Sequence, residues 1–258
     1  MITEEKNIAP KKTTGSTEPV IYIKGLCKSF GENLVLNGVD LVVNEGENLV
    51  VLGKSGSGKS ILIKCLVRLI SADSGEIKVF DTDMINIDNS GLNAVRLRIG
   101  FLFQNAALYD SMTVRQNLEF PLKRHSKKLS QEEVDNAVMA ALEDVGLAEA
   151  IDKMPAELSG GMRKRIGLAR MLILKPGIIL YDEPTTGLDT ITSREISELI
   201  LAIQKKNKAT SVIITHDMAC AKLTGDRIVI LKDGLINAAG TYDELQKSDD
   251  AWVRSFFN

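Results

Sequence analysis

Gly53-Lys54-Ser55-Gly56-Ser57-Gly58-Lys59-Ser60 is the stretch that decides the fold of this chain. It matches the pattern G-x-x-x-x-G-K-[ST] of a phosphate-binding loop at every fixed position. Residues 47–52 before it form an apolar run of strand length, and residues 61–70 after it carry apolar side chains at helical spacing. A strand, a loop and a helix in this order favour a phosphate site over a flexible Gly/Ser-rich linker.

This loop is expected to bind the phosphates of a nucleotide. Its glycines let backbone N–H groups turn toward phosphate oxygens, and the positive end of the following helix dipole faces the same anion. Lys59 should reach the β- and γ-phosphates, and the Ser60 hydroxyl should bind Mg²⁺. The predicted nucleotide-binding residues of this region are Gly53, Lys54, Ser55, Gly56, Ser57, Gly58, Lys59, Ser60 and Ile61.

The composition is that of a globular protein without a strong charge bias. The 258 residues carry a formal net charge of −2, and 44% are apolar and 26% charged, which suffices for one large domain or two small ones. This balance offers no basic surface for nucleic acid. The three cysteines show neither metal-site spacing nor a disulfide framework, which fits a reducing cytosol. No apolar run approaches the ~18–20 residues of a transmembrane helix.

Alternating strand and helix patterns predict an α/β fold with a mainly parallel sheet. Apolar runs such as residues 178–180 are typical of strands buried on both faces. Two earlier strands are expected at 20–24 and 34–44, the second broken by a turn at Asn37-Gly38. Asp233-Gly234 indicates a hairpin turn between two late strands.

A pair of acids follows one of the buried strands. Asp182 and Glu183 come directly after the run 178–181. In P-loop ATPases the strand beside the phosphate loop supplies an Asp that helps to hold Mg²⁺, and Asp182 fits that role. Glu183 is one residue further and so should point to the other side of the strand, where it can polarise a water for in-line attack on the γ-phosphate. The complete phosphate loop upstream weakens the alternative of a merely solvated strand end.

Leu158-Ser159-Gly160-Gly161-Met162 indicates a second anion site. The segment opens a helix predicted at 163–174, so exposed amides, a hydroxyl and a dipole end come together. Taken alone, the same residues could form only a helix N-cap with a Gly-Gly entry. Because the first site already surrounds the β-phosphate, the second could serve another nucleotide.

In this order, the segments 53–60, 158–162 and 180–189 (LYDEPTTGLD) resemble the nucleotide-binding domain of ABC transporters. The resemblance covers about residues 20–240. It implies a P-loop NTPase core of the ABC ATPase type, with an N-terminal antiparallel β subdomain and a helical subdomain inserted at about 105–160. It also implies ATP hydrolysis with Mg²⁺, by a head-to-tail homodimer that holds ATP between the phosphate loop of one subunit and Ser159, Gly160 and Gly161 of the other.

The resemblance also implies roles for single residues. Gln104 would contact Mg²⁺ and transmit the state of the nucleotide site to a membrane partner. His216 would orient the γ-phosphate and the attacking water. Asp189 would couple the two sites across the dimer. Phe30 would stack on adenine, with a core Phe as the alternative. The predicted catalytic residues are Glu183, His216, Gln104 and Lys59. The predicted metal ligands are Ser60, Gln104 and Asp182.

Residues 100–114 (GFLFQNAALYDSMTV) and 159–165 (SGGMRKR) look like the ATPases of Mla-type, MCE-associated phospholipid-trafficking systems of bacteria. This resemblance implies an integral-membrane permease that contacts a groove beside Gln104, with an MCE-type lipid-binding protein and a small regulatory subunit as further partners. It places the chain at the cytoplasmic face of the inner membrane. The chain departs from the family pattern at Thr190, where Pro is usual, and at Arg68, where Gly is commoner; no function is assigned to either departure.

The expected organisation has three parts. Residues 1–18 are polar and should form a disordered tail without a signal peptide. Residues 19–245 should form the ABC ATPase domain. Residues 246–258 contain several aromatic side chains, which is unusual for a chain terminus. Two alternatives stay open for this segment: it docks on a neighbouring subunit, or it packs on the chain's own domain.

Other functions were weighed against this one. Another ABC transporter, for example of the amino-acid or organic-solvent type, would carry the same site. A soluble ABC ATPase acting on ribosomes or DNA is disfavoured because the chain has one domain, no heptad insertion and no basic patch. A kinase or GTPase would leave residues 158–162 unexplained, and the guanine-reading N-K-x-D is absent. A non-enzymatic regulator is disfavoured because every catalytic position is filled.

Overall fold

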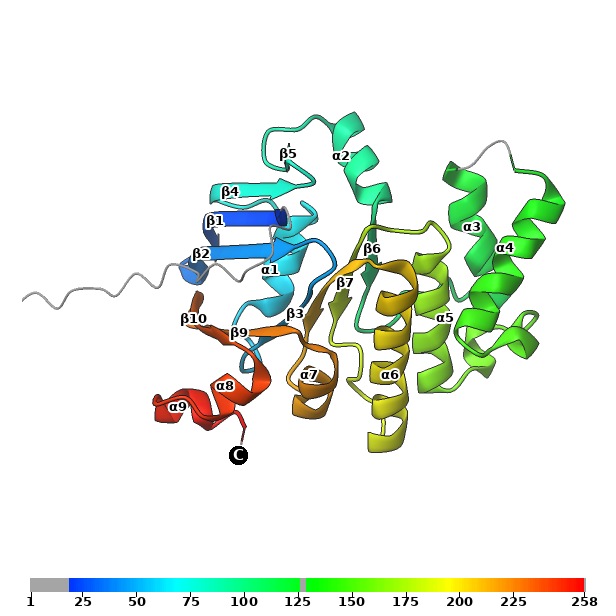
Figure 1. Ribbon diagram of the computed structural model, residues 1–258. Helices are drawn as coiled ribbons and strands as arrows, with labels where there is room; N and C mark the ends of the chain where they lie inside the picture. The colour runs from blue at the N-terminus through cyan, green and yellow to red at the C-terminus, as the bar shows by residue number, and fades with distance from the viewer. Residues whose placement is uncertain (1–18, 126–128, 258) are drawn as a thin grey trace, which may run out of the picture.

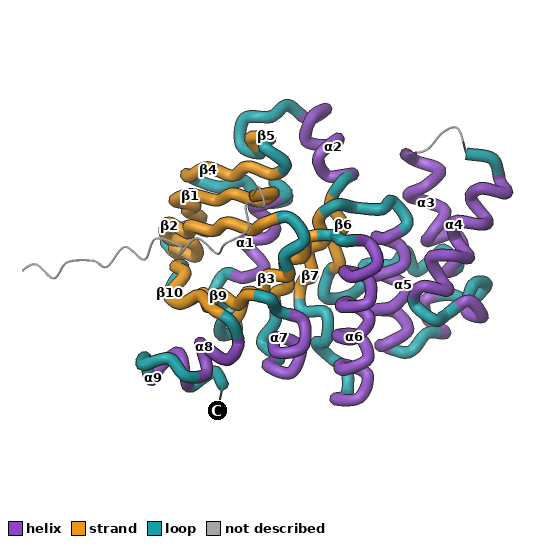
Figure 2. Tube along the Cα trace, viewed as in Figure 1, coloured by secondary structure: helices purple, strands orange, loops and turns teal. Residues whose placement is uncertain are grey.

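A computed structural model describes residues 19–125 and 129–257. The predicted tail at 1–18, residues 126–128 and residue 258 lie outside the described residues. Two sheets form the frame of the described chain, one of six strands and one of four. The smaller sheet lies at one end of the molecule, and the larger sheet extends from there into the middle, among the helices, as Figures 1 and 2 show.

The larger sheet contains the phosphate-loop strand. Its strands are β3 (Asn48–Leu52), β6 (Ile99–Leu102), β7 (Ile178–Asp182), β8 (Thr210–Ile214), β9 (Arg227–Lys232) and β10 (Leu235–Gly240). They run in the order β10-β9-β3-β8-β7-β6, and only the edge strand β10 pairs antiparallel. Every residue of β3, β7 and β8 is buried, as expected for strands covered on both faces. Because parallel strands end at one edge, the loops after β3, β6, β7 and β8 meet there.

The hairpin predicted at Asp233-Gly234 is present. Lys232 of β9 pairs with Leu235 of β10 across a two-residue turn. Both turn residues have positive φ, 50° for Asp233 and 76° for Gly234, as a type I′ turn requires.

The smaller sheet is the predicted antiparallel subdomain. Its strands are β1 (Pro19–Phe30), β2 (Asn33–Asn44), β4 (Ser74–Val79) and β5 (Thr82–Asp83), in the order β2-β1-β4-β5.

The turn predicted at Asn37-Gly38 is wrong, because β2 continues through these residues. Leu26 of β1 pairs with Val39 and the next residue, Cys27, pairs with Asn37, so Gly38 is the extra residue of a β-bulge. Its φ of 92° suits glycine and explains why the local sequence resembles a turn. Asn37 N donates to Gly234 O at 2.9 Å, which ties the bulge to the β9–β10 hairpin.

Helices complete the fold on both faces of the larger sheet. They are α1 (Lys59–Leu66), α2 (Asn89–Leu97), α5 (Gly160–Leu172), α6 (Thr190–Asn207) and α7 (Met218–Thr224). Side chains of β3 alternate between two cores, with Leu49 and Val51 in the core shared with α1 and the smaller sheet. Val50 and Leu52 face the other core, shared with α5 and α6.

The helical subdomain predicted at about 105–160 is also present. It contains α3 (Val114–His125), α4 (Gln131–Asp144) and the 3₁₀ turns η1 (Ala148–Ala150) and η2 (Pro155–Glu157). Figure 1 shows α3 and α4 side by side at the end of the molecule away from the smaller sheet. Ser130 and Glu133 form a capping box that fixes the start of α4.

The C-terminal segment packs on the chain's own domain in the described residues. It comprises α8 (Tyr242–Gln246) and α9 (Ala251–Arg254). Val253 is buried in the core, and the Lys232 ammonium lies 4.2 Å from the centre of the Trp252 ring. Phe257 contacts Tyr242 edge to face at 5.0 Å. Docking on a neighbouring subunit stays a prediction.

The structure gives Arg68 a local role. Its φ of 52° lies in the left-handed region, which explains why glycine is favoured at this position. Its guanidinium donates to Ile87 O at 2.7 Å and to the carbonyls of Met84 and Ile85 at 3.3 Å. The side chain therefore holds the segment between β5 and α2.

Candidate active site

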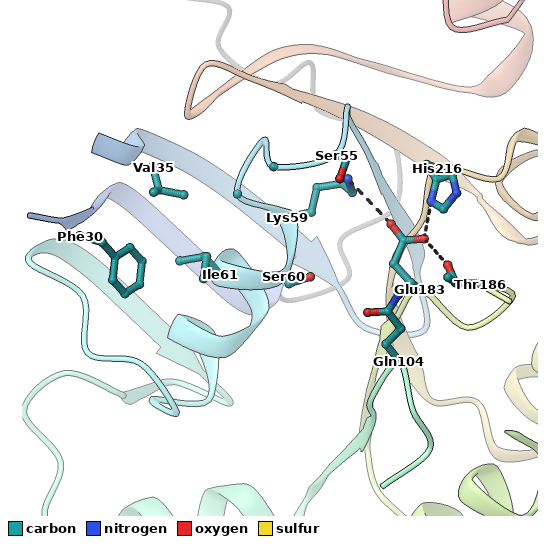
Figure 3. A pocket seen from close by; sticks show the side chains of 12 residues that line it. Phe30, Val35, Ser55, Lys59, Ser60, Ile61, Gln104, Glu183, Thr186 and His216 are labelled. Atoms are coloured by element: carbon teal, nitrogen blue, oxygen red, sulfur yellow. Dashed lines mark hydrogen bonds and ion pairs between the residues drawn. The ribbon is translucent and has the colours of Figure 1, made fainter. Parts of the chain in front are cut away.

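A cavity of about 550 Å³ lies at the edge where the parallel strands end. It brings together predicted residues from β1, the phosphate loop, and the loops after β6, β7 and β8. Figure 3 shows apolar side chains at one end, Glu183 and His216 at the other, and Lys59 and Ser60 between them. The lining residues are Phe30, Val35, Ser55, Gly56, Gly58, Lys59, Ser60, Ile61, Gln104, Glu183, Thr186 and His216.

The phosphate loop positions Lys59 through its own carbonyl groups. Gly56 and Gly58 have φ of 80° and 99°, so the loop makes turns that other residues rarely adopt. Lys59 Nζ donates to Gly53 O at 2.9 Å and to Lys54 O at 3.1 Å. The ammonium is thus held at the start of α1 and only 6% exposed. Burial lowers its pKa, although the charges of Glu183 and Asp182 oppose that shift.

Two of the predicted metal ligands are directly joined. Ser60 Oγ donates to Asp182 Oδ1 at 2.6 Å, across 122 residues of sequence. Gln104 lines the same cavity as Ser60. A hydroxyl, a carboxylate and an amide oxygen are ligands that suit Mg²⁺, which prefers oxygen donors and keeps several waters. The donor set therefore fits the predicted ion.

Glu183 stands at the centre of the polar end of the cavity. Its Oε2 lies 2.8 Å from His216 Nδ1 and accepts from Thr186 Oγ1 at 3.2 Å, while its Oε1 lies 3.9 Å from Lys59 Nζ. Since a carboxylate only accepts, the His216 Nδ1 must carry the hydrogen in this contact. The side chain of Glu183 is 13% exposed and that of His216 is 63% exposed.

Strand alternation predicted that Glu183 points to the other side of the strand from Asp182. This reasoning is wrong, although Glu183 lies in the cavity. Strand β7 ends at Asp182, and Glu183 has φ of 52°, outside the strand conformation. Its N–H donates to Ile214 O at 2.9 Å, so the end of β8 fixes this turn. No sequence pattern predicts this left-handed turn. It directs the Glu183 carboxylate toward Lys59 and His216.

Phe30 lies at the apolar end of the cavity. It ends β1, is 47% exposed, and lines the cavity with Val35 and Ile61. This exposure argues against the alternative of a core Phe. An exposed ring beside a phosphate loop offers a stacking face for a planar base.

Comparison with known proteins decides the family. The model of the ABC transporter family matches residues 36–186, more than half of the chain. The chain belongs to the ABC transporter family. The predicted ABC ATPase fold and the prediction of an ATP-hydrolysing enzyme are thereby confirmed.

Curated ABC relatives are longer than this chain. The probable ribonucleotide transport ATP-binding protein mkl of Mycobacterium leprae is 41% identical over 238 residues, which cover 92% of this chain and 68% of that protein. The methionine import ATP-binding protein MetN of Brucella abortus is 37% identical over 230 residues, which cover 89% of this chain and 62% of that protein. The chain thus spans about two thirds of the length of these relatives.

Solved ABC structures share the fold over most of the chain. The ATP-binding cassette MJ0796, in a dimeric post-hydrolysis state bound to ADP and Pi, has a TM-score of 0.79 and 32% identity, covering 86% of this chain and 98% of that one. The cassette cbiO1 from Clostridium perfringens, part of the ABC transporter complex cbiONQ, has a TM-score of 0.81 and 27% identity, covering 93% and 95%. Within residues 19–125 and 129–257 of the present ABC chain, no helix has the length and apolar character needed to cross a bilayer.

Eight predicted site residues do not line the cavity of this ABC subunit. Gly53, Lys54, Ser57 and Asp182 are within two residues of lining residues in the sequence, whereas Ser159, Gly160, Gly161 and Asp189 belong to other segments. Ser159 Oγ caps α5 by accepting from Met162 N at 3.2 Å. A Cβ on Gly161 would lie 2.5 Å from Thr192 Cγ2, so this glycine also lets α5 approach α6 closely.

Asp189 has a capping function that the sequence analysis missed. Its carboxylate accepts from Thr192 Oγ1 at 2.7 Å and from the N–H groups of Ile191 and Thr192 at 3.0 Å, which starts α6. These hydrogen bonds, led by that from the Thr192 hydroxyl, hold the pKa of Asp189 below its usual range. The signal was available, because an Asp directly before a helical pattern is a typical N-cap.

Two further residues contact the catalytic groups and were not predicted. Thr186 bonds to Glu183, and its spacing of three residues across a turn could have indicated it. Lys164 Nζ donates to Gln104 O at 2.5 Å and to Glu183 O at 3.2 Å. Burial lowers the pKa of Lys164 to about 8, against the opposing charges of Asp182 and Glu183. No local signal could have found it, because its partners are distant in sequence.

Proposed function

We propose that this chain is the ATP-binding and ATP-hydrolysing subunit of a bacterial ABC transporter. The observation that carries the proposal is that Lys59, Ser60 and Glu183 line one cavity, with Lys59 Nζ 3.9 Å from Glu183 and Ser60 bonded to Asp182. Lys59 would bind the β- and γ-phosphates between loop amides, and Phe30 would stack on adenine. Ser60, Asp182 and Gln104 would hold Mg²⁺, which when bound neutralises phosphate charge.

The arrangement supports in-line hydrolysis by these side chains. Glu183 would accept a proton as a water oxygen bonds to the γ-phosphorus, and the bond to the ADP oxygen breaks. The His216 hydrogen bond would orient the Glu183 carboxylate toward that water. Lys59 would stabilise the charge that develops on the phosphoryl oxygens.

The proposed active unit is a head-to-tail homodimer. Ser159 and Gly161 begin helix α5 at a place that does not line the cavity of their own subunit. They would meet the γ-phosphate bound by the second subunit, with Asp189 beside that interface. The dimeric ABC cassette among the relatives supports this arrangement.

Replacing Ser159 by Arg tests the contact in trans. In the Glu183→Gln background, which should trap ATP, the single variant should elute as an ATP-dependent dimer and the double variant as a monomer. A fluorescent ATP analogue should bind the double variant's own phosphate loop at unchanged affinity. The control is Ser130→Arg, which alters another N-cap serine and should cost about 0.5–2 kcal/mol of stability without preventing dimerisation. Normal ATP-dependent dimers of the Ser159 variant would reject the proposed arrangement.

The permease is proposed to dock on the loop after Gln104. Tyr109 is 39% exposed there, and its ring packs on Phe120 at 5.0 Å and under the Arg170 guanidinium at 4.5 Å. Buried Asn117 holds the loop by accepting from Tyr109 N at 2.8 Å and donating to the carbonyls of Tyr109 and Met112. A fixed loop that presents an aromatic side chain suits recognition of a partner.

The cargo we propose is phospholipid, moved between the inner and outer membranes. The support is the likeness of residues 100–114 and 159–165 to Mla-type ATPases, which work with an MCE-type lipid-binding protein and a small regulatory subunit. The relatives' names favour a second candidate, transport of a small molecule such as a ribonucleotide or methionine. In either case the chain would sit at the cytoplasmic face of the inner membrane, bound to its permease.

Co-purification from detergent extracts tests these proposals together. A tagged chain should retain a multipass membrane protein, and phospholipid in the complex should raise its ATPase rate above that of the isolated chain. Ribosomal protein or DNA in place of a membrane protein would contradict the transporter proposal. A multipass partner whose complex is stimulated by methionine or a ribonucleotide, and not by phospholipid, would contradict the cargo.

A further inference from the structure

One face of helix α5 follows the loop that carries Gln104. Lys164, Gly167 and Arg170 are three residues apart and so are successive neighbours on the helix surface. Lys164 bonds to Gln104 O at 2.5 Å. A Cβ on Gly167 would lie 3.0 Å from both Ala106 Cβ and Leu102 Cδ1, so the helix and the loop are in close contact. Arg170 donates to Ala107 O and stacks on Tyr109.

Lys164 connects this loop to the backbone of Glu183, the predicted base. Its Nζ also donates to Glu183 O at 3.2 Å, and the side chain is 5% exposed. Gln104 and Glu183 follow β6 and β7, which are paired neighbours in the sheet. The buried ammonium therefore joins the two loops that carry the predicted metal-contacting amide and the predicted base.

Both loops that Lys164 joins contain non-glycine residues with positive φ. Glu183 has φ of 52°, and Ala106 and Ala107, just after Gln104, have φ of 59° and 50°. Non-glycine residues adopt this region only where surrounding contacts hold them. A lysine that donates to carbonyl groups of both loops supplies such contacts, and Lys164 is itself buried.

We propose that Lys164 is a positioning residue for ATP hydrolysis, which fixes Gln104 and Glu183 relative to each other by donating to both backbone carbonyls. Lys164 does not itself line the cavity, and it meets the lining residues Gln104 and Glu183 only through their backbone carbonyls. Its loss should therefore change the placement of the catalytic groups and leave nucleotide binding unchanged. This inference rests on the proposed function of Glu183 and Gln104.

The test compares Lys164→Met, which removes the donors, with Lys164→Gln, which keeps a shorter donor. Lys164→Met should lower kcat by about 10–100-fold, as expected for a misplaced catalytic group, with the dissociation constant for ATP unchanged within about twofold. Lys164→Gln should recover most of that loss. Amide hydrogen exchange in residues 103–110 should be faster in Lys164→Met than in the wild type, and unchanged in α3 and α4. Lys205→Met, at an exposed position on α6, is the control and should match the wild type.

Each other outcome decides against the inference. Wild-type kcat in Lys164→Met, with ATP hydrolysis intact, would overturn it without affecting the proposed function. An equal loss of kcat in both variants would show that charge and not hydrogen bonding matters. If Lys164→Met does not fold, Lys164→Gln must still show faster exchange confined to residues 103–110, and exchange raised throughout the domain would overturn the inference. Absence of ATPase activity in the wild type would instead reject the proposed function.

Discussion

Replacing Glu183 with Gln should leave ATP binding intact and slow hydrolysis by about 10²–10⁴-fold, the usual contribution of a positioned general base. Gln has the same length and can still accept from Thr186 through its amide oxygen, so the shape of the cavity is kept. It cannot accept a proton from water. Removing a carboxylate that would lie beside the γ-phosphate also removes like-charge repulsion, so ATP should bind at least as tightly.

Steady-state phosphate release measures the rate, and gel filtration with ATP measures the expected long-lived dimer. Glu198→Gln makes the same chemical change on the exposed face of α6, where Glu198 pairs with Arg194 at 2.9 Å. This control should keep the wild-type rate, because exposed pairs of this kind contribute little. A Glu183→Gln rate within about tenfold of the wild type would reject Glu183 as the base.

Replacing Lys59 with Ala should reduce nucleotide binding by at least about 100-fold and bring turnover to background. The ammonium would otherwise make charge-assisted hydrogen bonds to two phosphates, and each such bond contributes roughly 1.5–3 kcal/mol. The alanine methyl group cannot reach the ligand. Lys59 is the hydrogen-bond partner of two loop carbonyl groups and lies 3.9 Å from the Glu183 carboxylate, so its removal should also cost some stability, and binding is compared on the folded variant.

Titration with a fluorescent ATP analogue and the steady-state rate measure this prediction, and thermal unfolding checks the fold. Lys64→Ala, on the same helix α1 and partly exposed, removes an equal charge away from the cavity. It should bind nucleotide like the wild type. Near-normal turnover by Lys59→Ala would remove the assignment of residues 53–60 as the phosphate site.

Sequence reasoning found most of the cavity because its motifs are local. The phosphate loop and the histidine each follow a recognisable buried strand, the acid pair ends another, and parallel strands bring their ends to one edge. The bulge at Gly38 was misread because a glycine with positive φ occurs both in turns and in bulges. The orientation of Glu183 was reached through a wrong argument, since the chain leaves the strand one residue earlier than alternation requires.

The sequence by itself determined the phosphate loop, the alternation of strands and helices in the α/β core, and the identity of the groups that can do the chemistry. These depend on residue types at fixed spacing, which short-range sterics and hydrogen bonding convert into local structure. Only the tertiary structure decided that Ser60 meets Asp182, that Glu183 faces Lys59 and His216, and that Lys164 joins the loops of Gln104 and Glu183. Such contacts join residues far apart in the chain, and they follow from how the sheet and α5 pack, for which no local pattern exists.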